Sequence, residues 1–186
     1  MGLHRRAVAN FTQKVEQITV DQWDRPTPCS EWDVRALVNH LVYEERWTEP
    51  LVDGRTIEDV GTSLDGDLLG DDPLAALAAS AAEAVAAVDE RVPAGGTVQL
   101  SFGDVPITEY VMQLTADHLV HGWDLAAATG MNRILDPELV AEVLDWFAPQ
   151  EDTWRGAGAI GPRSDAGGDP QSDLLAAYGR DPDWEV

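Results

Sequence analysis

The chain has 186 residues, enough for one domain with a full hydrophobic core. Its 12 basic and 34 acidic side chains give a formal charge of −22, which repels nucleic-acid phosphates and anionic lipid headgroups. Neither a nucleic acid nor a membrane is therefore expected as a partner. Cys29 is the single cysteine, so an internal disulfide is excluded, and residues 1–14 lack the apolar core of a signal peptide. These features predict a cytoplasmic protein.

Apolar residues that recur at steps of three and four predict five helices in the first 150 residues: 4–20, 30–51, 73–92, 108–129 and 137–147. Ser30, with Asp33 three residues later, forms a capping-box-like start for the second helix. Pro73 stands at the start of the alanine-rich third helix, and Gly130 ends the fourth. The Gly- and Asp-rich residues 56–72 predict a loop, residues 97–107 a small hairpin or an irregular connection, and residues 171–178 a last short helix.

This pattern predicts an all-α protein, an antiparallel bundle of four principal helices with an extra short helix and a minor β-hairpin. We expect a single domain over residues 1–186. The bundle takes up about residues 3–150, and residues 151–186 form a loop-rich tail. The alanine-rich third helix offers a face on which two copies could pair as a homodimer.

Asp117 and His121 are the most informative residues of the chain. They lie four positions apart in the fourth predicted helix, so both project from one side of it, and that side also carries core residues. His40, near the middle of the second helix, also faces the bundle interior at least in part. Two imidazoles and one carboxylate on facing helices predict a divalent-metal site with an open position, zinc first and nickel or iron as alternatives. The alternative interpretation is a hydrogen-bonded trio without a metal.

Other polar residues lie close to these three in the sequence. His118 and Asp124 are candidates for supporting or packing roles beside the ligands. Glu44, one turn after His40, is a candidate fourth ligand, a general base or a solvated helix residue. Cys29, at the predicted start of a helix, invites interpretation as a nucleophile, but no histidine is its sequence neighbour and Glu31 would oppose formation of the thiolate.

Three separated segments resemble known proteins: residues 25–42 around His40, residues 117–126, and the tail from Gly161 to Pro182. Together they resemble the actinobacterial DinB-like proteins related to the metal-binding domain of mycothiol-dependent maleylpyruvate isomerase. The resemblance implies a four-helix bundle that holds a divalent metal, usually zinc or nickel, on His40, Asp117 and His121. In the isomerase the acidic ligand is a glutamate, one methylene longer than Asp117. The isomerase also carries an additional C-terminal domain, in whose place this chain has only a loop and a short helix.

The resemblance and the predicted site together favour a metal-dependent thiol transferase or an isomerase-like enzyme. Its partners would be a small-molecule thiol, such as mycothiol, and an electrophile. A binding or sensing protein without turnover and a metal-dependent hydrolase are the alternatives, as is a metal-free scaffold.

Overall fold

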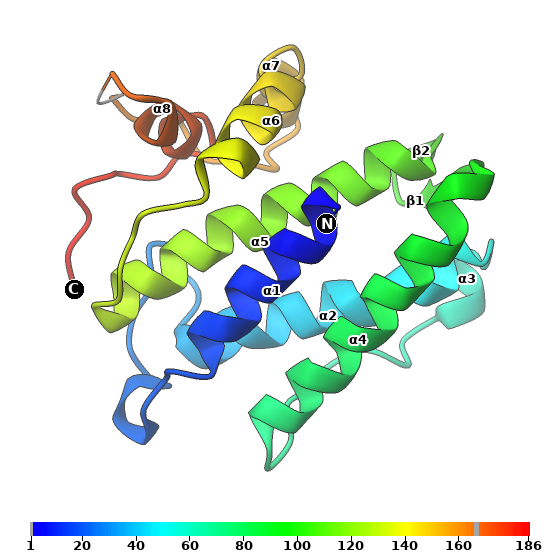
Figure 1. Cartoon of the computed structure of the whole chain (residues 1–186), viewed down its shortest axis with the longest axis horizontal. Helices are drawn as coiled ribbons and strands as arrows, with labels where there is room; N and C mark the ends of the chain where they lie inside the picture. The colour runs from blue at the N-terminus through cyan, green and yellow to red at the C-terminus, as the bar shows by residue number, and fades with distance from the viewer. Residues whose placement is uncertain (1, 166–167) are drawn as a thin grey trace.

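The structure is a computed structural model that describes residues 2–165 and 168–186. Its centre is a group of four long helices, in which α1 packs on α4 and α5, and α2 packs on the same two helices (Figure 1). Their bounds are α1 Leu3–Val15, α2 Val34–Val52, α4 Pro73–Arg91 and α5 Ile107–Thr129. The predicted all-α class is confirmed. None of the helices in the described residues combines the length and the hydropathy that crossing a membrane requires.

The first helix is shorter than the sequence predicts. α1 ends at Val15. The amides of Gln17 and Ile18 then donate hydrogen bonds to carbonyls only three residues back, those of Lys14 and Val15. The run Ile-Thr-Val that follows is β-branched at every position, which disfavours a helix. Val20 instead begins a three-residue 3-10 helix, Val20–Gln22, and is 93% exposed.

The second helix starts later than expected. Its N-cap is Asp33, whose carboxylate accepts a hydrogen bond from the Ala36 amide at 2.8 Å, and Ser30 is not the cap. The preceding segment is folded back on itself, because the Thr27 hydroxyl donates to the Trp32 carbonyl at 2.8 Å. Cys29 therefore lies in a structured loop ahead of the helix, beside the end of α2 that carries His40.

In the middle of the chain, capping residues and glycines determine where the helices and strands begin and end. The predicted loop 56–72 contains one helical turn, α3 (Ile57–Val60), which Thr56 and Asp59 cap reciprocally. Asp72 caps α4, and a 3-10 helix, Val92–Ala94, follows it. The predicted hairpin is present as the antiparallel strands β1 (Thr97–Leu100) and β2 (Gly103–Pro106). Gly130, in the left-handed conformation with φ 76°, ends α5 as predicted.

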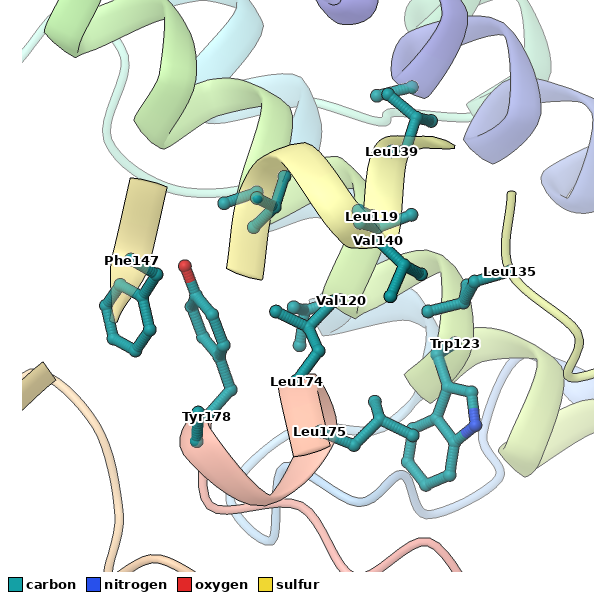
Figure 2. Packing of buried hydrophobic residues seen from close by; sticks show 14 of the residues in the cluster. Leu119, Val120, Trp123, Leu135, Leu139, Val140, Phe147, Leu174, Leu175 and Tyr178 are labelled. Atoms are coloured by element: carbon teal, nitrogen blue, oxygen red, sulfur yellow. The ribbon is translucent and has the colours of Figure 1, made fainter. Parts of the chain in front are cut away.

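The last third of the chain covers one face of α5. It contains α6 (Pro137–Phe147), α7 (Glu151–Gly156) and α8 (Pro170–Ala177), of which α7 was not expected. Figure 2 shows Leu174 and Leu175 of α8 facing Val120 and Trp123 of α5. The Tyr178 ring stacks on Phe147 at 4.3 Å between centroids. The tail is thus anchored by buried apolar side chains, and this packing brings the residues after α8 back to the C-terminal half of α5.

Candidate metal centre

His40, Asp117 and His121 meet between α2 and α5. Nε2 of His40 is 3.0 Å from Oδ2 of Asp117, and Nε2 of His121 is 3.3 Å from Oδ1 of the same carboxylate. One donor atom from each side chain lies within 4.8 Å of the other two. The structure therefore brings the three predicted residues together, with the carboxylate between the two imidazoles.

Asp117 and His121 carry opposite charges in this arrangement. Burial alone would raise the pKa of Asp117, but the charges and hydrogen bonds of His121 and His40 hold that pKa well below its usual range. Burial alone would lower the pKa of His121, but Asp117 and then Asp124 raise it well above the usual value. The side chains thus satisfy one another, so the metal-free trio is a consistent state of the protein.

The same arrangement fits a divalent ion. Two imidazole nitrogens and a carboxylate oxygen form a donor set that binds zinc, and three protein ligands leave a further position open. The trio lines a hollow of about 480 Å³, which also includes Cys29 and Arg180. Nδ1 of His121 is 2.9 Å from Oδ2 of Asp124, and a carboxylate on the second ring nitrogen is the usual support of a metal-binding histidine.

Asp124 is fully buried and is held mainly by Arg180. Nε of Arg180 donates to Oδ1 at 2.9 Å, and Nη2 donates to Oδ2 at 2.8 Å. Burial alone would raise the pKa of Asp124, but the hydrogen bonds from His121 and Arg180 lower it. Asp124 therefore contacts a trio residue directly, as its predicted supporting role requires. Arg180 was not singled out, although it lies within the tail segment that carries the resemblance.

Cys29 is much closer to the trio than its sequence neighbours suggest. Its Sγ accepts a hydrogen bond from Nη2 of Arg180 at 2.9 Å and lies 3.9 Å from Nδ1 of His121. With His121 and Asp124 it forms a second group whose donor atoms lie within 4.8 Å of one another. The Cys29 thiol also donates to Oδ2 of Asp124 at 3.4 Å. The expectation that Cys29 begins a helix is wrong, since α2 starts at Val34.

Glu44 and His118 lie in different surroundings. Glu44 is half-buried and lines a smaller hollow with His40 and Asp117. Burial and then the charge of Asp117 raise the pKa of Glu44 to about 7. His118 instead points into the bundle, where its Nε2 lies 3.0 Å from Oε1 of the buried Glu45. The Ser80 hydroxyl donates to the other oxygen of Glu45. This second polar cluster was not expected, because a glutamate beside Glu44 carries no signal of burial.

A family model for the mycothiol maleylpyruvate isomerase N-terminal domain matches residues 4–126. The chain belongs to this family. Two uncharacterized proteins from two strains of Mycobacterium tuberculosis are each 35% identical to it over 147 residues, which is 76% of this chain and 73% of each relative. No solved structure matches the chain at a significant level. The predicted resemblance and the DinB-like helical fold are thus confirmed.

The match to the isomerase N-terminal domain ends before several residues that surround the trio. It includes Asp124 but stops at residue 126, whereas Tyr178 and Arg180 come from the tail. Trp32, within the match, was also missed. Its ring lies 4.6 Å from the His40 ring and 5.5 Å from the His121 ring, so it covers one side of both. The surroundings of the trio are therefore built by the family domain and the tail together.

Proposed function

We propose that this protein is a metal-dependent enzyme that acts on a low-molecular-weight thiol of the mycothiol type. His40, Asp117 and His121 would hold the ion, with zinc the first choice and nickel or iron the alternatives. The observation that carries the proposal is the position of the trio on the wall of an open hollow of about 480 Å³. The thiol in the name of the family supports the choice of substrate. We place the protein in the cytoplasm, where such thiols are kept reduced.

A divalent ion on the trio would lower the pKa of a bound thiol and stabilise its thiolate. The chain's own residues would orient and protect the site. Asp124 holds the His121 ring, and Trp32 covers the rings of both histidines. Glu44, with a pKa of about 7, is suited to accept the thiol proton. The sulfur then forms a bond to an electrophilic carbon, and the displaced electron pair goes to a leaving group in a substitution or to the carbonyl oxygen in an addition.

Metal-dependent hydrolysis is the second candidate, because Glu44 would serve equally well as a general base for water. A protein that binds or senses a metal without turnover would use the same three ligands.

The metal is tested by elemental analysis of protein purified without added metal. We expect about one equivalent in the wild type and a loss of most of it in His40→Ala and His121→Ala. His4→Leu is the control, because His4 lies on α1 and belongs to neither group of potential ligands. Less than about half an equivalent in the wild type, unchanged in the two alanine variants, would exclude the site.

Thiol chemistry is tested in two steps. Protein loaded with Co²⁺ should develop a sulfur-to-cobalt charge-transfer band when mycothiol is added, and His121→Ala should not. Turnover is then followed with mycothiol and chlorodinitrobenzene, in which a carbon–sulfur bond forms and chloride leaves. A charge-transfer band without turnover above that of metal-free protein would favour the non-catalytic binder, and the absence of both would exclude the thiol.

A further inference from the structure

His40 and Asp117 line two hollows with different surroundings. The larger one contains Cys29 and Arg180, and the smaller one, of about 170 Å³, contains Glu44 and Tyr110 instead. The trio therefore lies between two spaces. An enzyme that joins a thiol to a second molecule needs such an arrangement, since the two reactants must meet at one point.

The smaller hollow adjoins a surface groove. Glu44, Tyr110 and Gln113 line both spaces, so the hollow opens towards a groove of about 390 Å³ between α2, the hairpin and α5. The rest of the groove is mainly apolar, with Trp47, Leu51, Ile57, Leu100 and Phe102 in its lining. Phe102 is at the tip of the hairpin and is 69% exposed. Together the two spaces have the size and the apolar walls of a small-molecule site.

Two residues that line the smaller hollow have buried hydroxyls without a hydrogen-bond partner among the described residues. They belong to Tyr110 and Tyr178, which are 3% and 7% exposed. Figure 2 shows the Tyr178 ring beside Phe147, with its hydroxyl directed away from α8. Burial and then the charge of Glu44 raise the pKa of Tyr110, although the nearby Thr48 hydroxyl lowers it in part; burial and then the charge of Asp117 raise the pKa of Tyr178. Both phenols thus remain protonated and keep a hydrogen that can be donated.

The lining of these spaces offers an anion no permanent cation. No lysine or arginine lines either the hollow or the groove among the described residues. The space on the other side of the trio differs, because Arg180 supplies a cation there. An anion that entered the smaller hollow would lose its hydration without gaining a lysine or arginine as a partner.

We propose that the groove and the smaller hollow bind an uncharged carbonyl compound with an aromatic or similarly apolar body. Its carbonyl oxygen accepts hydrogen bonds from Tyr110 and Tyr178, and its body lies against Trp47 and Phe102. This inference rests on the proposed function in one respect, that the bound compound is the electrophile which meets the thiol at the trio. The binding itself depends only on the residues that line the two spaces.

The test uses the full chain stripped of metal with a chelator, and two probes of nearly the same shape, acetophenone and benzoate. We expect acetophenone to bind and to shift the indole NMR signals of Trp47 and Trp154, which line the two spaces, while Trp123 in the core stays unchanged. Benzoate should bind at least about tenfold more weakly, because it would give up its hydration without meeting a lysine or arginine.

Tyr110→Phe and Tyr178→Phe should each weaken acetophenone binding roughly two- to tenfold, the effect of one hydrogen bond. Tyr43→Phe is the control, because Tyr43 lines only the outer groove and its hydroxyl is not among the buried unpartnered atoms. The proposal would be overturned if benzoate bound as tightly as acetophenone. It would also be overturned if acetophenone shifted neither the Trp47 nor the Trp154 signal, because the hollow would then hold only water. Because no metal or thiol is present, this outcome is independent of the tests of the proposed function.

Discussion

Replacing Arg180 by methionine is expected to destabilise the protein through the charge that it leaves behind. Methionine keeps much of the side-chain volume but removes the donors that reach Asp124 at 2.8, 2.9 and 3.2 Å. The Asp124 side chain is 0% exposed, so the carboxylate would remain buried with His121 as its main partner. Breaking a buried ion pair in this way costs about 3–5 kcal/mol. Arg180 is itself 15% exposed, which places the expected loss near the lower limit, about 3 kcal/mol.

The free energy of unfolding is measured by urea titration with tryptophan fluorescence, and the expected loss corresponds to a fall in Tm of roughly 6–12 °C. Arg163→Met is the matched control. Arg163 is 42% exposed and forms a surface ion pair with Glu151, so its loss should cost under about 1 kcal/mol. Adding Asp124→Asn to Arg180→Met should restore part of the stability, because it removes a buried charge that has lost its guanidinium partner.

Two results would refute this reasoning. One is an Arg180→Met variant within about 1 kcal/mol of the wild type, which would mean that Asp124 finds solvent or another partner. The other is an Asp124→Asn addition that destabilises the single variant further. The same Arg180 variant should lower metal affinity about tenfold or more, since Asp124 would orient His121 less well.

Three more predictions follow from charge and backbone geometry. Because the pKa of His121 is raised, metal binding at neutral pH should release about one proton, measurable by calorimetry in buffers of different ionisation enthalpy, and affinity should rise with pH. The buried Glu45 raises the pKa of His118 although burial alone would lower it. Their pairing therefore stabilises the fold fully below pH 6.5, the ordinary pKa of histidine, and less as the pH rises through the raised pKa. The loss of unfolding free energy in Glu45→Gln, measured by urea titration, should become smaller as the pH rises. Gly179→Ala should lose about 1–3 kcal/mol in the same assay, because φ is +73° and a Cβ would meet backbone at 3.1 Å, whereas Gly158→Ala, at +77° with open space around it, should lose less.

The sequence was sufficient for the features that depend on local patterns. Periodic apolar residues predicted the four long helices, and the spacing of Asp117 and His121 placed both on one side of α5. The errors lie at helix ends, where the β-branched residues after Val15 and the competing cap at Asp33 decide the boundary.

The surroundings of the trio could not be predicted in the same way. Arg180 is 56 residues from Asp124 in the chain, and only the packing of α8 on α5 brings them into contact. Glu45 differs from its neighbour Glu44 by one helical position, about 100° of rotation, and this rotation places it against His118 instead of the trio. Long-range pairs of this kind leave no periodic signal in a single sequence.

The ion pair between Asp124 and Arg180 also makes residues 124 and 180 mutually dependent during evolution. One lies inside the segment that the family shares and the other in the tail beyond it. A substitution at either position alone passes through a state in which a buried charge has lost its main partner. Among relatives we therefore expect the two residues to be gained and lost together, and a tail grafted from one relative onto another to be tolerated only when position 124 matches it.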